Sequence, residues 1–163
     1  MRSTLLASLS IVALSVSAVA YAAGGGGGGA SMDTPAAKPA DPNYAQAKAM
    51  IEARNYAGAM PLLQQVVARD PKNPDAYNLM GFATRKSGDA NGSLVYYNQA
   101  LTIDPKHIGA HEYVGEAYLQ LGRLPEAEQH LARLDSLCVF GCTEYRMLKA
   151  AIADYKAGKK PTN

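Results

Sequence analysis

The sequence predicts an all-α protein, a solenoid of three helix pairs followed by one C-terminal helix. The tripeptide Asp-Pro-Lys at positions 70–72 recurs 34 residues later, at positions 104–106. Apolar side chains between these points follow the three-and-four spacing of amphipathic helices. A fixed period of this length is typical of stacked repeats. A series of small residues keeps the same spacing: Ala59, Ser93 and Ala127.

Residues 1–22 have the features of a secretory signal peptide. Arg2 supplies the positive charge, residues 5–19 form an uncharged apolar stretch, and residues 20–22 read Ala-Tyr-Ala, the small-x-small form of a cleavage site. The apolar stretch is shorter than the about 20 residues of a membrane span. We therefore expect cleavage, no integral membrane segment in the mature protein, and a periplasmic or secreted location. An uncleaved N-terminal anchor remains the alternative.

Residues 23–41 predict a flexible tether. Residues 24–29 are all glycine, and Pro35 and Pro39 follow in a stretch without apolar periodicity. Glycine loses the most entropy on ordering, and proline interrupts helices. A solvated tether of this kind needs no further role, although it would also serve as a spacer.

Residues 42–158 predict the folded domain, and each repeat reads as two helices. Gly88 separates the two helices of the second unit, because glycine takes positive φ at low cost. Pro105 ends the second helix of that unit, since the residue before a proline disfavours helix. The apolar stripes of the two helices are Tyr77, Met80, Gly81 and Thr84, then Leu94, Tyr97, Ala100 and Leu101.

The flanking units and a terminal helix complete the predicted domain. The first unit places Ala47 and Ile51 before the turn and Leu63 after it, and the third places Gly115 before the turn and Leu131 after it. The terminal helix has Thr143 as its expected N-cap and Gly158 after its last turn. Its polar outer face would solvate the end of the array, and residues 159–163 form a tail. One apolar stripe runs along this helix: Tyr145, Leu148, Ile152 and Tyr155.

These repeats resemble the tetratricopeptide repeat family. Units starting at residues 40, 74 and 108 hold that family's aromatic and small residues in register, and the first unit is the most divergent, as expected of a terminal repeat. The resemblance implies a right-handed superhelix of three tetratricopeptide-type helix pairs, closed by the C-terminal solvating helix. It covers residues 40 to about 158. The second unit carries the match most fully: Tyr77, Gly81, Ser93, Tyr97, Ala100 and Pro105.

The resemblance also implies a concave groove lined by the first helix of each pair. In this groove Phe82 and Tyr44 would be apolar anchors. Basic groups near the middle (Lys48, Arg85 and Lys86) would select charge, and acidic groups lie towards the C-terminal side. Such a groove suits a peptide segment of another protein; the alternative is an ordinary solvated face. The clamp that binds a C-terminal carboxylate in some members is not carried over, because its positions hold Tyr44, Leu79, Gly109 and Tyr113. The transferred groove positions are Tyr44, Lys48, Asn78, Phe82, Arg85, Lys86, Glu112, Glu116 and Leu119.

Cys138 and Cys142 predict a disulfide. Two nearby cysteines in an oxidising compartment should pair, and Gly141 would break the helix so that the sulfurs can meet. The alternative is thiol redox or metal handling, because thiolates are soft metal ligands. His107 and His111 are four residues apart, but ligand spacing alone is weak evidence, so we predict no metal site.

Charge and motifs exclude other classes. Sixteen basic and 14 acidic residues give a net charge of +2, which argues against a nucleic-acid partner. No phosphate-binding loop or nucleophile elbow occurs, so we predict no catalytic residue and no cofactor. The sequence therefore predicts a non-enzymatic, protein-binding module of the cell envelope, an adaptor or assembly factor. A purely structural subunit of an envelope complex is a further alternative.

Overall fold

The computed structural model describes residues 41–161. The predicted signal peptide, the predicted tether except Asp41, and the last two residues of the tail lie outside this range. The described chain is helical, without a strand, as predicted. Its helices are α1 (Pro42–Glu52), α2 (Tyr56–Arg69), α3 (Pro74–Lys86), α4 (Ala90–Ile103), α5 (Ile108–Gln120), α6 (Leu124–Leu137) and α7 (Thr143–Lys156).

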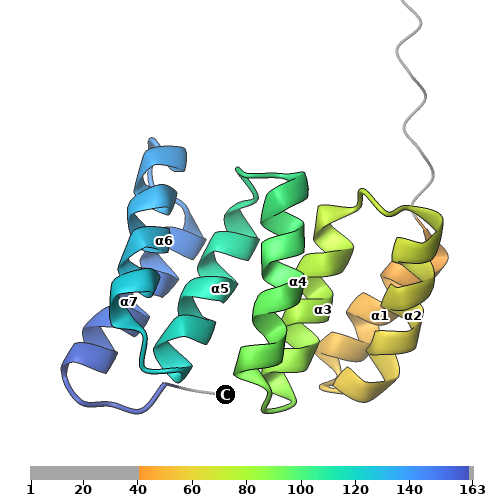
Figure 1. Cartoon of the computed structure of the whole chain (residues 1–163), viewed down its shortest axis with the longest axis horizontal. Coiled ribbons are helices and arrows are strands. Elements are labelled where there is room, and N and C mark those ends of the chain that lie inside the picture. Colours follow the sequence, from red (N-terminus) through yellow and green to blue (C-terminus); the bar gives the residue numbers. More distant parts are fainter. Residues whose placement is uncertain (1–40, 162–163) are drawn as a thin grey trace, which may run out of the picture. The chain divides into compact units, whose positions relative to one another are not determined.

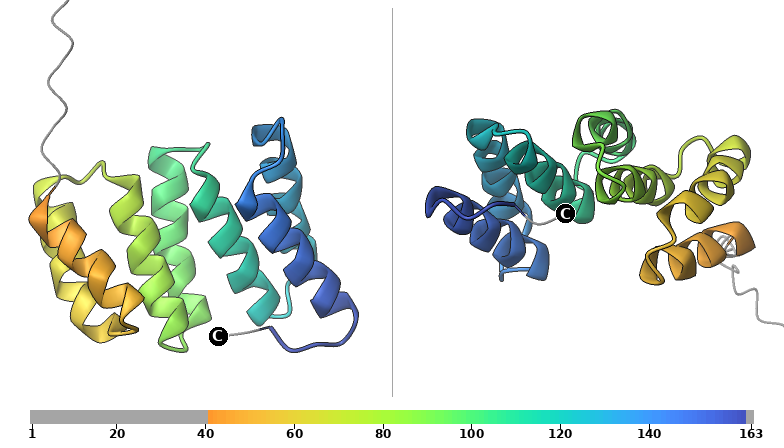
Figure 2. Two further views of the ribbon diagram at one scale, coloured as in Figure 1. Left: turned by 180° about the vertical axis from the view of Figure 1, so that it is seen from behind. Right: turned by 90° about the horizontal axis from the view of Figure 1, so that it is seen from below.

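The helices form three hairpins and a final helix, stacked in chain order (Figure 1). The odd-numbered helices lie side by side on one face, and the even-numbered helices cover the other (Figure 2). Contacts between α1 and α3, α3 and α5, and α5 and α7 join successive repeats. This is the superhelical solenoid of helix pairs that the family resemblance implied. No helix within residues 41–161 is both long and apolar enough to cross a membrane.

Glycine is required where helices approach one another closely. A Cβ on Gly81 would lie 2.6 Å from the Tyr97 ring, and a Cβ on Gly115 would lie 2.6 Å from Leu148 of the terminal helix. Side-chain carbons cannot approach this closely, so alanine at either site would push two helices apart. The predicted small series is also packed, with Ala59, Ser93 and Ala127 all buried.

The turn inside each repeat depends on one residue in the left-handed region. Gly88 has φ of 101° and Gly122 has φ of 74°. The first repeat has Arg54 at the equivalent position, with φ of 60°. Left-handed backbone after a helix satisfies its last carbonyls, and glycine is the residue that adopts it without steric cost.

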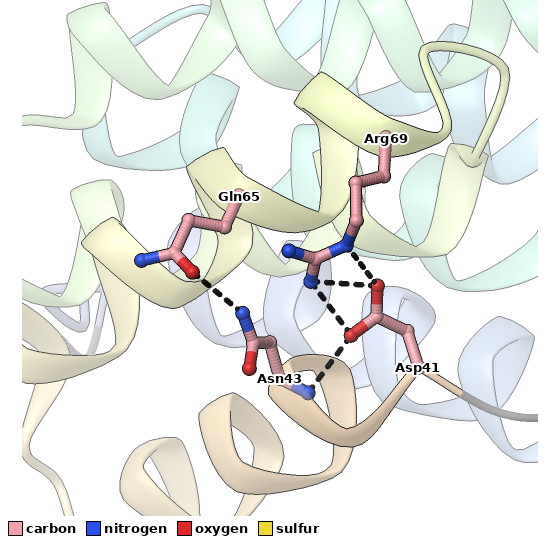
Figure 3. Close-up of polar contacts among 4 residues, drawn as sticks. All are labelled: Asp41, Asn43, Gln65 and Arg69. Atoms are coloured by element: carbon pink, nitrogen blue, oxygen red, sulfur yellow. Dashed lines mark hydrogen bonds and ion pairs between the residues drawn. The ribbon is translucent and has the colours of Figure 1, made fainter.

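Side-chain contacts close the N-terminal end of the array. The Asp41 carboxylate caps α1 by accepting from the Asn43 backbone N–H at 2.8 Å, and Arg69 of α2 donates to both of its oxygens at 2.8–3.0 Å (Figure 3). The Asn43 amide donates to Gln65 at 2.8 Å. Asp41 was predicted to belong to the tether; it is the N-cap that joins α1 to α2.

The predicted disulfide closes the turn between α6 and α7. The Cys138 and Cys142 sulfurs lie 2.12 Å apart. The N-cap of α7 is Cys142, whose sulfur accepts from the Tyr145 N–H at 3.4 Å, so the prediction of Thr143 as the cap was one residue late. The helix ends at Lys156, and Gly158 follows its last turn with φ of 80°, as predicted. Val139 and Phe140 are exposed at the tip of this loop.

Candidate functional site

An open hollow of about 350 Å³ lies where the first repeat meets the second. We call it the Phe82 hollow. Most of its wall comes from α1 and α3, with the turn after α1, the first residue of α2 and one residue of α5 completing it. Its lining residues are Lys48, Ile51, Glu52, Arg54, Tyr56, Leu79, Phe82 and Tyr113. Lys48 and Phe82 were among the groove positions predicted from the sequence.

Three aromatic rings form a row through the hollow. The Phe82 centroid lies 6.2 Å from that of Tyr56, edge to face, and 4.9 Å from that of Tyr113. The three rings come from three successive repeats, and each remains partly exposed. Offset and edge-to-face pairs of this kind hold rings in fixed orientations. The row is therefore a preformed apolar surface that is open to solvent.

Positive charge predominates around these rings. Lys48 and Arg54 are exposed lining residues, and the Lys86 ammonium lies 5.5 Å from the Phe82 centroid. Burial, followed by the neighbouring Arg85 cation, lowers the pKa of Lys86. Glu52 is the acidic residue in the lining. An apolar floor with a mainly cationic rim favours ligands that combine apolar and anionic groups.

Arg85, predicted to select charge in the groove, is fully buried behind the aromatic row. Its guanidinium pairs with Glu116 at 2.6 Å and donates from Nε to the Tyr97 hydroxyl at 3.4 Å. It also lies 5.6 Å from the Phe82 ring and 5.9 Å from the Tyr113 ring. The prediction that Arg85 meets a ligand is thus corrected: it supports the rings from within.

Three further predicted groove residues are also buried: Asn78, Glu112 and Leu119 are 7%, 2% and 2% exposed. Burial, and then the nearby Glu116 carboxylate, raise the pKa of Glu112 to about 8, against the opposing effect of Arg85. This raised pKa favours the protonated, neutral form of Glu112. The groove prediction placed these side chains against a ligand, but neighbouring helices cover them.

The remaining predicted positions lie at the two ends of the face. Tyr44 is half-buried in the core of the first repeat, where burial raises its pKa to about 12, and it does not line the Phe82 hollow. Glu116 and Leu119 border a second, smaller hollow of about 70 Å³ beside residues 159–161. The predicted acidic half of the groove is therefore narrow and is partly bordered by the chain's own tail.

The histidines bond to protein groups. His107 caps α5 by accepting from the Ala110 N–H at 3.0 Å, and its other nitrogen lies 3.1 Å from Asp75. His111 pairs with His130 at 2.9 Å and with the Pro105 carbonyl at 3.1 Å. Among residues 41–161, no group of three or more His, Cys, Asp or Glu side chains is arranged to hold a metal ion.

Comparison with known proteins identifies the architecture. Two family models described as tetratricopeptide repeat match residues 44–108 and residues 84–152. The chain belongs to the tetratricopeptide repeat family. Members of this family are typically non-enzymatic binding modules, and no catalytic family was matched. One curated relative, the protein O-mannosyl-transferase Tmtc3 of Drosophila melanogaster, is 36% identical over 66 residues. That match covers 40% of this chain and 7% of the relative, so the chain spans a small part of it.

Solved tetratricopeptide structures share the fold. SycD, a type III secretion translocator chaperone of Yersinia enterocolitica, matches with a TM-score of 0.63 and 19% identity, over 71% of this chain and 82% of that one. SycD has also been solved with a peptide of the translocator YopD. The first repeat domain of Spaghetti (RPAP3), bound to an HSP90 peptide, matches with a TM-score of 0.62 and 18% identity, over 71% of this chain and 90% of that one. Protein-binding modules are thus built on this fold.

Six lining residues were not predicted: Ile51, Glu52, Arg54, Tyr56, Leu79 and Tyr113. A signal for two of them was present in the period. Arg54 corresponds to Gly88 and Gly122, and Tyr56 corresponds to Ala90 and Leu124. The first repeat therefore departs from the other two where the hollow opens.

Proposed function

We propose that this protein is a periplasmic or secreted adaptor or assembly factor that binds a segment of another protein in the Phe82 hollow. The leader-like N-terminus supports an envelope location. A disulfide in a short loop also fits an oxidising compartment. Peptide complexes of other tetratricopeptide proteins support the class of partner.

The observation that carries the proposal is the row of Tyr56, Phe82 and Tyr113 along an open hollow. A ring of the core would be covered, whereas these three are each part-exposed around about 350 Å³ of unfilled space. Ligand sites typically have volumes of about 300 to 1,000 Å³ and a mainly apolar lining. Aromatic residues at the centre of an interface commonly supply most of its binding energy.

The test is capture of partners from the native envelope fraction by the immobilised full chain and its Phe82→Ala variant. The matched control is Val95→Ala on α4, since Val95 is apolar and 69% exposed. We expect a defined partner to bind the parent and V95A and to be lost, about ten-fold or more, with F82A. Circular dichroism should show equal helix content. A partner that binds F82A as well as it binds the parent would refute the site.

The location is tested separately by fractionation and sequencing of the mature N-terminus. We expect a periplasmic or secreted chain that starts at Ala23, after the Ala-Tyr-Ala site, or at Tyr21, after the second small-x-small triplet Ala-Val-Ala at residues 18–20. A cytoplasmic chain that retains Arg2 would overturn the proposed location and leave the binding proposal standing.

A further inference from the structure

Arg54 occupies a position at which the other two repeats have glycine. The chain leaves α3 through Gly88 and α5 through Gly122, whereas it leaves α1 through Arg54. All three residues have positive φ, with Arg54 at 60°. In this region the Cβ of a residue other than glycine crowds the following carbonyl. Arginine also lacks the short polar side chain that lets asparagine and aspartate adopt it more easily.

Arg54 also lines the Phe82 hollow, and its cation has no ion-pair partner within residues 41–161. Burial and then Arg85 lower the pKa of Lys86 most, and the positive charge of Arg54 lowers it slightly further. Like charges held near each other destabilise the free protein. A residue that combines a strained backbone with an unpaired cation costs stability, so its presence in the hollow indicates a role in binding and not in folding.

The other charges near the hollow strengthen its positive field. Lys48 is a second exposed cation in the lining, and α2 begins at Tyr56, so the positive end of its dipole lies at the wall. Buried Arg85 adds little to this field because Glu116 neutralises it at 2.6 Å. Glu52 provides one opposing charge in the lining.

We infer that the Phe82 hollow selects an acidic segment, in which an apolar side chain on the aromatic row is accompanied by a carboxylate bound at Arg54. Arg54 is then the residue that determines specificity, and its strain is the cost in stability of presenting a guanidinium there. This inference rests on the proposed function and names the chemistry of its partner.

The test is fluorescence anisotropy with the full chain and three labelled peptides. The first is an eight-residue peptide amide with a central Leu-Phe flanked by Asp and Glu. The second replaces every Asp and Glu by Asn and Gln. The third is the second with a free C-terminal carboxylate. These three separate side-chain carboxylates, amides and a chain terminus as the group that is recognised.

Two variants make the test specific. Arg54→Gly removes the cation and the strain, and Lys72→Gly removes an exposed cation from the turn after α2. We expect the parent and K72G to bind the acidic peptide about ten-fold tighter than its amide counterpart. R54G should bind both within about two-fold of each other, and its melting temperature should rise. If the third peptide binds and the first does not, and if R54G loses that binding, the inference is supported and the carboxylate bound by Arg54 is the C-terminal one.

The outcomes separate this inference from the proposed function. Equal affinity for all three peptides, dependent on Phe82, would overturn the acidic preference and leave the peptide site standing. An acidic preference that survives in R54G would overturn the role of Arg54. A lower melting temperature for R54G would overturn the strain argument. Absence of binding by every peptide, combined with a partner captured equally by F82A, would instead refute the proposed function.

Discussion

At the scale of single residues, the inner face contains charges that serve the fold. Arg85 and Glu116 pair at 2.6 Å beneath the aromatic rings. Glu112 lies one helical turn before Glu116 and is 2% exposed. Because the Arg85 guanidinium already neutralises Glu116, it cannot neutralise the Glu112 carboxylate to the same extent. Protonation is the cheaper way to bury Glu112, which is why its pKa is raised.

The raised pKa predicts how stability changes with pH. A carboxyl whose pKa is higher in the folded than in the unfolded state contributes fully below about pH 4.5, and the contribution is lost as the pH rises through about 8. Glu112→Gln should therefore be about 2 kcal/mol more stable than the parent at pH 8.5, with the difference shrinking towards pH 4.5. Urea unfolding followed by circular dichroism at several pH values measures this.

Glu116→Gln is the matched control for this prediction. It removes the same kind of charge one turn away, but from the residue that neutralises Arg85. Its effect at pH 8.5 should be a loss of stability, because a buried cation is left without its partner. Two variants that shift stability in the same direction would contradict the division of roles between the two carboxylates.

The period of the sequence held information on Arg85 that the groove prediction did not use. The equivalent residues in the neighbouring repeats are Ile51 and Leu119, which are both apolar. A position that is apolar in two of three repeats is a packing position, and Arg85 is indeed fully buried there. The depth of a charged side chain depends on partners from other helices, here Tyr97 and Glu116, which linear spacing does not reveal.

At the scale of helices, two histidines join α5 to α6 in the third repeat. His111 Nε2 lies 3.1 Å from the Pro105 carbonyl, so this nitrogen is the donor, and Nδ1 is left to accept from His130 at 2.9 Å. Both bonds are satisfied with the two rings neutral, whereas protonation of both rings would place two N–H groups against each other. Tyr118 stacks on His130 with a centroid separation of 5.6 Å, and the Arg123 guanidinium lies 4.6 Å from the Tyr118 centroid. A positive charge on His130 would therefore face the Arg123 cation across the Tyr118 ring and not an anion.

The pair predicts acid sensitivity of the third repeat. Burial, and then His111, lower the pKa of His130 to about 4, and burial, with Arg133 and His107, lowers the pKa of His111. A depressed pKa contributes stability above about pH 6.5 that is lost as the pH falls towards 4. We expect about 2 kcal/mol of loss over this range.

The variant His130→Phe tests the acid sensitivity, because it keeps a ring against Tyr118 and cannot take up a proton. Its free energy of unfolding, measured with urea at pH 7 and pH 5, should change less with pH than that of the parent. His107→Asn is the comparison outside the pair, since Asn73 caps the preceding repeat in the same way. It should keep most of the pH dependence of the parent, because burial is the main cause of both lowered pKa values. An unchanged pH dependence in H130F would contradict the prediction.

At the scale of the whole array, the period predicts the architecture but not the location of the site. Every repeat supplies a first helix to one face, so the groove prediction followed all three repeats alike. The hollow exists because the repeats differ, with Arg54 and Tyr56 replacing the smaller Gly88 and Ala90 of the next unit. Asymmetry of this kind appears only when the units are compared position by position. The size of the open space depends further on how the helices pack.

The terminal helix is the part of the array with a covalent constraint. In a solenoid each element is stabilised by its neighbours, and α7 has neighbours on one side only. Its contacts are with α5 and α6, including Leu148 against Gly115. The disulfide between Cys138 and Cys142 restricts the conformations of the loop that connects α6 to α7. Its effect should therefore be local to the C-terminal end.

Replacing both cysteines by serine should cost about 2 kcal/mol in the chain-entropy model for so short a loop. Hydrogen exchange resolves where this loss falls: amides of α7 around Leu148 and Ile152 should exchange faster, and those of α1 and α3 should not change. Peptide binding at the Phe82 hollow should also be unchanged, because the hollow is built from the first two repeats and Tyr113. The parent treated with a thiol reductant is the control and should match the double variant. Loss of peptide binding in the double variant with α7 protection intact would contradict a structural role for the cysteine pair and favour the thiol-based alternative.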